Sequence, residues 1–452
     1  MESTEALRLS EVLDPDIGAP AASRTTGGAS PAMMRRLAGA SMVGTTLEWY
    51  DFTVYNTMAA LIFNKLFFPS FSPLAGVILA FSTYAVGYVS RPLGGVFFGH
   101  LGDKLGRRVV LVVTLIVMGL TTFLMGVLPT FDAVGIASPL LLVSLRFIQG
   151  VALGGEWAGS VLLSVEHGRQ DRRGLNASWT QVGPSMGTLL ATALITLVTM
   201  TLSDQDFVAW GWRIPFLVSA ILVGFGLWVR IGVDETPMFK QIESAHKQAK
   251  APVGEVLTKH LRSLIIAGGA RVGSDVLFAL VVVFTMTYVT QVLNLPRPVA
   301  LTAVLIGAAF NVVCVPLFGR LSDSIGRRPV YAIGAVAGAV WAYVFFGLLD
   351  TANPYLIVLA VVAGLIFHAA MYGPQGAFVT EQFSTRVRYS GSSLAYTFAG
   401  VVGGGFAPLI IVTLYHAYSS TLAVSLYVMG ALCVTGIALW AAKETAGRPL
   451  QD

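Results

Sequence analysis

Long apolar runs recur along the chain and alternate with short polar segments. The first six runs cover residues 37–63, 74–99, 109–128, 139–165, 175–200 and 212–231. A second six cover residues 263–291, 299–319, 329–348, 354–378, 391–415 and 421–442. Each run can cross a hydrocarbon core of about 30 Å as a helix, and backbone polar groups in lipid must find their partners within a helix or a closed barrel. We therefore predict an all-α membrane protein with twelve transmembrane helices.

One long mixed-charge stretch, residues 232–260, separates the two sets of runs. We interpret it as a cytoplasmic, partly helical linker between an N-terminal six-helix bundle, 34–231, and a C-terminal one, 261–442. Residues 1–33 are polar and rich in Ala, Ser, Gly and Pro, which predicts a disordered tail without a cleavable signal peptide. Residues 443–452 form a short second tail. We expect both tails to be cytoplasmic.

Composition supports lipid as the solvent, because 55% of the residues are hydrophobic and only 12% are charged, against about 25% in soluble proteins. The net charge of +5 does not indicate nucleic-acid binding. The basic residues gather in loops on one side, and only Lys65, Arg213 and Arg297 lie near the predicted outer loops. This asymmetry is the positive-inside pattern of a multi-pass plasma-membrane protein. Cys314 and Cys433 fall in apolar runs, so neither a disulfide nor a metal site is expected.

The two halves repeat in sequence. GHLGDKLGRRVV at 99–110 returns as GRLSDSIGRRPV at 319–330, with seven of twelve positions identical. Such repeats predict two like-oriented bundles around a central cavity that opens alternately to each side. An acid beside a basic cluster can bind a neighbouring helix end, so we predict a gating latch at Asp103, Arg107 and Arg108, and at Asp323, Arg327 and Arg328. Basic loops that serve topology alone are the alternative.

Further motifs identify a family resemblance. They are Glu48–Phe52 and Arg91–Gly95, Arg146 followed by Gln149, Gly150, Gly154, Gly155 and Glu156, then Gly211–Phe216 and Glu235–Pro237. Together with the repeated loop they resemble the metabolite:proton symporter family of the major facilitator superfamily. That resemblance implies import of small organic acids or zwitterions such as α-ketoglutarate, citrate, shikimate, proline or betaine. It also implies the proton as coupling ion, and we expect no cofactor.

The first predicted span carries charged residues, which are costly in lipid and therefore require a cavity, a partner or a function. A charged side chain at the bilayer centre costs about 2.5–3.5 kcal/mol on insertion scales. Gly44, Glu48, Asp51 and Tyr55 share one helical stripe, which we expect to face the cavity. A carboxylate that exchanges an Arg for a proton can couple transport, and the resemblance aligns Asp51 and Arg146 with proton-linked positions. A permanent buried ion pair is the alternative for this pair.

Glu48 and Glu156 complete the proton-coupling candidates. Glu156 follows a glycine-rich run that allows close helix packing, so it could instead pin helices together.

Substrate binding is predicted at Arg91, whose guanidinium can grip a carboxylate with two parallel hydrogen bonds. A fixed pair with Glu48 or Glu156 is the alternative. Arg271 and Asp275 are i, i+4 neighbours that either bind substrate or neutralise each other. His368, Tyr372 and Gln375 share one stripe beside a Gly373–Pro374 break. The remaining cavity candidates are Tyr55, Gln149, Trp157 and Tyr396, with Trp179, Gln181 and Tyr288 as weaker ones.

The predicted function is uptake of a small carboxylated metabolite by proton symport, performed by a monomer. Proton- or sodium-coupled uptake of proline or betaine is the nearest alternative, and efflux of a metabolite or drug is a further one. We find no channel filter, Walker loop or nucleophile–base spacing, so we predict neither a channel, an ATP-driven pump nor an enzyme. A transport-inactive sensor remains a hypothesis. Arg213 is expected to anchor the outer end of the sixth span and not to touch substrate.

Overall fold

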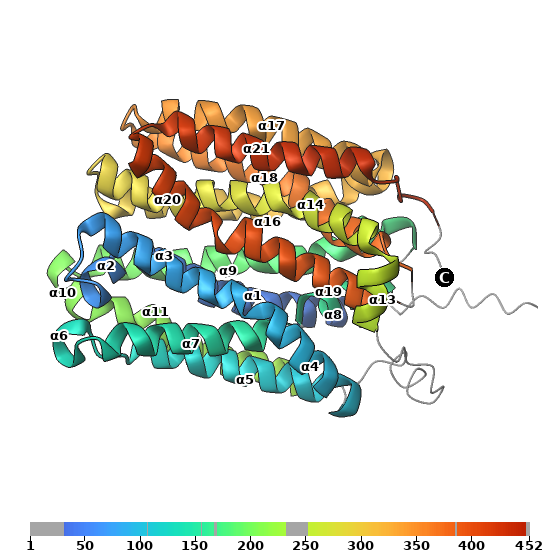
Figure 1. Ribbon diagram of the computed structural model, residues 1–452, viewed down its shortest axis with the longest axis horizontal. Coiled ribbons are helices and arrows are strands. Elements are labelled where there is room, and N and C mark those ends of the chain that lie inside the picture. The colour runs from blue at the N-terminus through green and yellow to red at the C-terminus, as the bar shows by residue number, and fades with distance from the viewer. Residues whose placement is uncertain are drawn as a thin grey trace, which may run out of the picture.

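The computed structural model describes residues 31–105, 107–154, 156–166, 170–231, 252–384 and 387–448. Nearly all of these residues are helical, and the helices run side by side along one long axis (Figure 1). Predictions for the 1–30 part of the tail and for residues 232–251 of the linker lie outside the described residues. The last part of the predicted linker forms the helix α13 (Pro252–Lys259).

The described residues of the first six passes form eleven helices and two 3-10 turns. They are α1 (Pro31–Leu61), α2 (Phe63–Phe67), α3 (Pro73–Val89), α4 (Arg91–Leu105), α5 (Arg107–Gly126), α6 (Phe131–Val134), α7 (Ala137–Leu153), α8 (Glu156–Glu166), η1 (Gln170–Arg172), α9 (Arg173–Thr201), α10 (Asp204–Ala209), η2 (Gly211–Arg213) and α11 (Ile214–Ile231). Pass two breaks between α3 and α4. Pass four consists of α7 and α8, and Gly155 between them lies outside the described residues.

The second six passes follow α13. They are α14 (Leu261–Phe278), η3 (Ala279–Phe284), α15 (Thr285–Thr287), η4 (Tyr288–Val292), α16 (Arg297–Ile325), α17 (Arg327–Leu349), α18 (Pro354–Glu381), α19 (Arg388–Ala399), η5 (Gly400–Gly405), α20 (Ala407–Tyr418) and α21 (Thr421–Ala441). The segments η3, η4 and η5 are π-helical. Passes seven and eleven therefore carry the wider turns that often mark functional positions.

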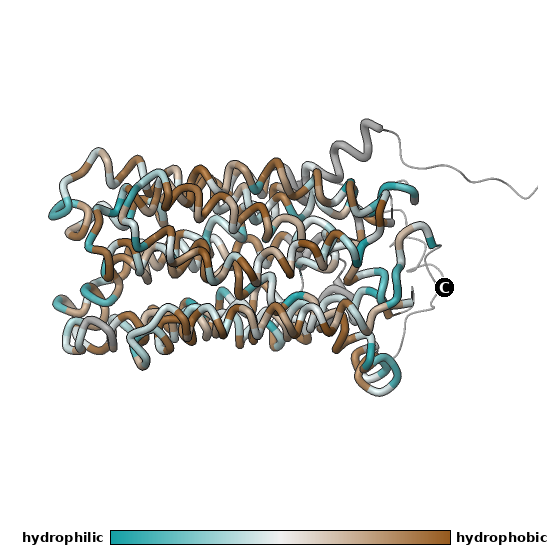
Figure 2. The backbone as a smooth tube through the Cα atoms, turned by 90° about the horizontal axis from the view of Figure 1, so that it is seen from above, coloured by the Kyte–Doolittle hydropathy of each residue, from teal (hydrophilic) through white to brown (hydrophobic). Residues whose placement is uncertain are grey.

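The long axis is the membrane axis. Within the described residues, nine helical stretches, from Ala137–Leu162 onward, are long and apolar enough to cross a membrane, and Val112–Gly126 is a shorter apolar helix. Hydrophobic residues fill the middle of the bundle and hydrophilic residues gather toward its two ends (Figure 2). We call the end that holds α13 and the end of α21 the inner end, and the end that holds α2, α6 and α10 the outer end (Figure 1). The charge pattern predicts that the inner end is cytoplasmic.

The two six-helix halves pack against each other along most of their length. On one side α9 of the first half packs against α16 and α18 of the second. On the other side α3 packs against η5 and α20, and α19 packs against α4 and α8. The candidate site lies in the seam between these helix pairs.

Close packing inside the first half depends on glycine. A Cβ added to Gly150 on α7 would overlap the carbonyl oxygen of Gly87 on α3, and one added to Gly154 would overlap the carbonyl oxygen of Arg91. Small residues let membrane helices approach until their backbones touch, and the resulting van der Waals packing drives helix association in lipid, where no hydrophobic force acts between helices. The glycine-rich run therefore fixes passes two and four against each other, as its sequence predicted for Gly150 and Gly154.

Candidate functional site

Arg91 and Glu48 form a buried ion pair at the break of pass two. The Arg91 Nη2 lies 3.5 Å from the Glu48 Oε1, and their side chains are 4% and 3% exposed. The break has a local cause, because Pro92 has no backbone N–H to donate one turn back along the helix. The guanidinium also lies over the rings of Tyr88 and Phe52, at 4.2 and 4.5 Å from their centroids. The alternative of an Arg91–Glu48 pair is thus the arrangement in this conformation.

Asp51 is connected to Arg146 through two other side chains. The Thr122 hydroxyl on α5 donates to Asp51 Oδ2 at 2.7 Å, and the Gln149 Nε2 donates to the same Thr122 oxygen at 2.7 Å. Arg146 Nη1 in turn donates to Gln149 Oε1. Among the described residues Asp51 and Arg146 form no ion pair within 4.0 Å. The chain Asp51–Thr122–Gln149–Arg146 lies inside the first half, between α1, α5 and α7.

The predicted stripe on α1 therefore splits between two surroundings. Glu48 points to Arg91, whereas Asp51 points to α5. Tyr55 shares a hydrogen bond with Thr83 on α3, and Arg146 lies over the Tyr55 ring at 4.1 Å. The expectation that the whole stripe faces a central cavity does not hold in this conformation, because the polar groups of Asp51 and Tyr55 are taken up inside the first half.

A second buried ion pair lies in the other half. Arg271 Nε lies 2.8 Å from Asp275 Oδ2, one turn apart on α14. Arg271 also donates to the carbonyl oxygen of Tyr396 at 2.5 Å, and its guanidinium lies 3.3 Å from the centroid of the Tyr396 ring. Arg271 and Asp275 therefore neutralise each other in this conformation, and the Tyr396 ring lies against the Arg271 guanidinium.

The glycine-rich η5 segment separates the two ion pairs. On one side Cβ atoms placed on Gly400 and Gly403 would meet Arg271 and Asp275 at 3.4 and 3.1 Å. On the other side a Cβ on Gly404 would lie 2.9 Å from the Tyr88 ring, which carries Arg91 on its face. Charged pairs from both halves thus converge on one thin segment.

Aromatic rings close the seam next to this segment. Trp157 on α8 stacks on Tyr396 on α19 with 3.8 Å between ring centroids. The Trp157 Nε1 donates to Gln181 on α9 at 2.9 Å, and Gln181 donates to the Tyr372 carbonyl oxygen at 3.4 Å. Trp157, Gln181 and Tyr396 therefore pack together between the halves, and their role in lining a cavity stays a prediction.

The polar stripe on α18 is buried along the other side of the seam. His368 and Tyr372 stack with centroids 4.9 Å apart, and Gln375 Oε1 accepts hydrogen bonds from Ser274 and Tyr331 at 3.4 and 3.3 Å. His368 also reaches Asn311, whose side chain accepts a hydrogen bond from Ser185 of the first half. The stripe therefore takes part in the contact between α9, α16 and α18.

Four further predicted residues lie in different surroundings. Glu156 is buried in the first turn of α8, where a helix N-terminus favours negative charge. Trp179 on α9 is 41% exposed, and its role as a cavity residue stays a prediction. Tyr288 donates to Asp350 at 2.5 Å and lies toward the outer end. Arg213 donates to the carbonyl oxygens of Gly126 and Leu128, so it binds the end of α5 and not the seam.

At the inner end, Asp323 joins the two halves. Its two carboxylate oxygens accept the backbone N–H groups of Gly174 and Leu175 at 2.8 and 2.9 Å, at the start of α9. Arg327 holds the same carboxylate at 2.7 Å. We call this arrangement the Asp323 latch. It closes the inner end because α9 belongs to the first half and Asp323 to the second.

Arg328 serves the second half alone, where it donates to the carbonyl oxygens of Leu439 and Trp440 at the end of α21. The counterpart residues Asp103, Arg107 and Arg108 have side chains outside the described part of the chain.

Sequence reasoning missed the residues that complete these networks. Glu381 pairs with Arg173 at 3.2 Å and with Arg327 at 3.4 Å, and so bridges the halves beside the latch. A weak signal for it lies in the sequence, where Glu166, Arg172 and Arg173 of the first half are echoed by Glu381, Arg386 and Arg388 of the second. Thr122 gave no signal, because a threonine in an apolar run is ordinary.

This chain is similar in sequence to known membrane transporters. A family model described as the Major Facilitator Superfamily matches residues 41–408 and 275–451. The shikimate transporter of Escherichia coli is 39% identical over 415 residues, which cover 91% of this chain and 95% of that protein. The proline/betaine transporter of the same organism is 31% identical over 437 residues, covering 92% and 85%.

Solved structures with a similar fold include a D-xylose–proton symporter. Its TM-score is 0.73 at 19% identity, over 92% of this chain and 99% of that one.

Proposed function

This chain belongs to the major facilitator superfamily, and we propose that it imports a small carboxylated metabolite together with protons across the bacterial inner membrane. It is a multi-pass membrane transporter and not an enzyme. The substrate class and the coupling ion are the proposal.

The observation that carries the proposal is a pair of buried arginines, one from each half, on the two sides of η5. Arg91 and Arg271 are 3% and 1% exposed, and the Nε of Arg91 and the Nη2 of Arg271 have no hydrogen-bond partner among the described residues. A buried charged donor without an acceptor costs free energy. A carboxylate that enters between the halves would supply those acceptors, and it would do so in a two-pronged geometry that arginine favours.

The buried Asp51 supports a proton as the driver. It is 2% exposed, and its hydrogen-bond donor is the neutral Thr122 and not an arginine. A carboxylate held by a hydroxyl can take a proton without breaking an ion pair, since the hydroxyl can also act as acceptor. Each net positive charge that enters down 100 mV yields about 2.3 kcal/mol, enough for roughly fiftyfold accumulation. A monoanion that enters with one proton moves no net charge, so its import is driven by the pH difference, and a second proton is needed to draw on the potential.

Relatedness supports an organic acid, because the shikimate transporter is the more similar of the two relatives described above. Each arginine also has a carboxylate beside it, Glu48 or Asp275, so a zwitterion such as betaine is the second candidate.

Uptake by the purified protein in proteoliposomes tests the proposal. Labelled shikimate, a dicarboxylate, proline and betaine are offered with and without an inward proton gradient. We expect gradient-driven accumulation of an acid that a protonophore abolishes. Arg91→Ala should lower uptake at least about tenfold, since one charged hydrogen bond is worth about 1.5–3 kcal/mol.

Asp51→Asn separates coupling from binding. It should abolish gradient-driven accumulation and leave substrate exchange across the membrane intact, because exchange needs no net proton movement. Arg320→Ala and Asp132→Asn, at exposed positions, are the matched controls. Accumulation of betaine alone, or acid uptake that ignores the protonophore, would contradict the proposal.

A further inference from the structure

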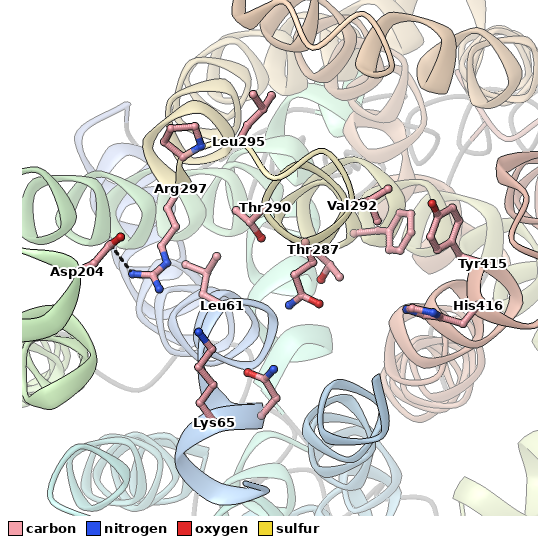
Figure 3. A pocket seen from close by; sticks show the side chains of 14 residues that line it. Leu61, Lys65, Asp204, Thr287, Thr290, Val292, Leu295, Arg297, Tyr415 and His416 are labelled. Atoms are coloured by element: carbon pink, nitrogen blue, oxygen red, sulfur yellow. Dashed lines mark hydrogen bonds and ion pairs between the residues drawn. The ribbon is translucent and has the colours of Figure 1, made fainter. Parts of the chain in front are cut away.

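A cavity of about 450 Å³ opens at the outer end of the seam, away from Arg91 and Arg271. Its wall comes from both halves: Lys65 of α2 and Asp204 of α10 on one side, and Thr287 of α15, Arg297 of α16 and His416 of α20 on the other. Figure 3 shows Lys65 and Arg297 extending toward the same space, with Tyr415 and His416 across from them. The volume lies in the range of small-molecule sites, about 300–1,000 Å³.

The charges of the cavity favour an anion. Lys65 and Arg297 are its two basic residues, and Asp204 is its one acid. Arg297 Nη1 lies 2.9 Å from Asp204 Oδ1, but the Asp204 side chain is 91% exposed while Arg297 is 17% exposed. An ion pair with one solvent-exposed partner contributes only about 0.2–1 kcal/mol to stability. A carboxylate inside the cavity would lie between two cations and would therefore compete with Asp204 for Arg297.

Two buried polar groups of the wall lack partners. Asn64 is 9% exposed and Thr287 is 3% exposed, and the Asn64 Oδ1 and Thr287 Oγ1 have no hydrogen-bond partner among the described residues. Buried polar groups are paired in the great majority of cases, so these two groups in the wall of a cavity are candidates to bind a ligand or water there. Asn64 Oδ1 can accept a hydrogen bond from a ligand hydroxyl, and the Thr287 hydroxyl can donate to a carboxylate.

We propose that this cavity is a second, outer binding site for a small hydroxylated carboxylate, whose carboxylate replaces Asp204 as the partner of Arg297. The identity of that ligand with the transported substrate rests on the proposed function. The exchange has a structural consequence, because Arg297–Asp204 joins the two halves at the outer end. The hydrogen bond from Gln291 to the Ala60 carbonyl oxygen, at 2.9 Å, is a second contact between the halves there.

Protection of Lys65 from acetylation tests the site without any transport. The full chain in detergent is treated with an amine-acetylating reagent, and the rate at Lys65 is followed by mass spectrometry. Shikimate should slow the reaction at least threefold relative to chloride at equal ionic strength, and cyclohexanecarboxylate, which lacks hydroxyls, should slow it less. The exposed Lys259 at the inner end is the internal control and should not respond.

Two variants locate the protection. Arg297→Gln should remove it, whereas Arg91→Ala, which alters the central seam, should leave it. If Lys65 reacts at the same rate with and without shikimate, the outer site is overturned.

Substitution of the ion pair distinguishes a binding site from a simple gate. Loss of Arg297 removes a cation that binds the ligand, while Asp204→Asn removes its competitor. We therefore expect Arg297→Gln to raise the apparent KM for acid uptake and Asp204→Asn to lower it, each by about threefold or more, with Asp132→Asn unchanged. If both substitutions shift KM in the same direction, the pair is only a gate and the site is overturned.

The two proposals can fail separately. Protection of Lys65 by shikimate together with uptake of betaine alone would overturn the proposed function and support the outer site. Gradient-driven acid uptake without protection of Lys65 would support the proposed function and overturn the outer site.

Discussion

Each membrane charge in the described spans meets a specific neighbour, and the neighbour decides what the charge can do. Asp51 receives a hydroxyl from Thr122, and Arg146 lies among the rings of Phe52 and Tyr55 and donates to Gln149. The sequence indicated that Asp51 and Arg146 act together. The structure inserts Thr122 and Gln149 between them, so Asp51 is free of a direct guanidinium contact.

Thr122→Val tests the importance of this connection. The valine keeps the shape and removes both the donor to Asp51 and the acceptor of Gln149, which leaves buried polar atoms unpaired at a cost of about 1–3 kcal/mol. We expect gradient-driven uptake to fall about tenfold in proteoliposomes. Thr121→Val is the matched control, because the Thr121 hydroxyl bonds only to carbonyl oxygens of its own helix. Equal uptake by both variants would show that Asp51 does not need Thr122.

At the scale of elements, helix breaks and glycines place the charges. Pro92 interrupts pass two beside Arg91, and the glycines of η5 let Tyr88 and Arg271 approach the same segment from opposite sides. Side chains at those glycines would push the ion pairs apart. The helix break at Pro92 and the glycines of η5 therefore position the two ion pairs at the seam.

Gly150→Ala should destabilise the protein. Its Cβ would overlap the Gly87 backbone, and overpacking costs about 1–3 kcal/mol. We expect a lower apparent Tm in detergent for this variant. Gly224→Ala on α11 is the control, because nothing lies within 4 Å of a Cβ there and alanine is the better helix former. A Tm for Gly150→Ala that equals or exceeds the control would refute the close approach of α3 and α7.

At the scale of the whole molecule, the inner end is closed and the outer end carries a cavity. The Asp323 latch and the Arg173–Glu381 pair join the halves at the inner end. The outer end holds the halves together through Arg297–Asp204 and Gln291 around an open space. Alternating access requires these two sets of contacts to break in turn.

Asp323→Ala should open the inner end. The substitution removes a charged acceptor from two backbone N–H groups of α9, each bond worth about 1.5–3 kcal/mol, so the population of inward-open molecules should rise at least tenfold. A cysteine at Ser178, which packs beside Gly319 in the α9–α16 contact, reports this opening once Cys314 and Cys433 are replaced by alanine. We expect faster maleimide labelling of that cysteine. The exposed Asp171 provides the control, and if Asp171→Asn accelerates labelling as much, the latch has no specific role.

Much of the fold could be predicted because the length of each apolar run and the position of the basic residues are visible in short stretches of sequence. The twelve passes, the division into halves and the repeat around Asp323 all follow from patterns within a few dozen residues. The break inside pass two was harder to predict, since the apolar pattern continues through it. Glu48 as the partner of Arg91, Thr122 of Asp51 and Gly174 of Asp323 lie more than forty positions away along the chain, and periodicity cannot identify such partners.

The sequence by itself determined that this chain lies in a membrane, forms two related bundles, and carries buried charges on its first, second, fourth and seventh passes. The free energy of transferring an apolar residue into lipid and the cost of a charge there are properties of the residues themselves, so the sequence alone predicts them. Only the tertiary structure decided which acid meets which base, that Asp323 binds the start of α9, and that Lys65 and Arg297 share a cavity. Those contacts depend on distances between helices, and these distances are fixed by packing of the whole molecule.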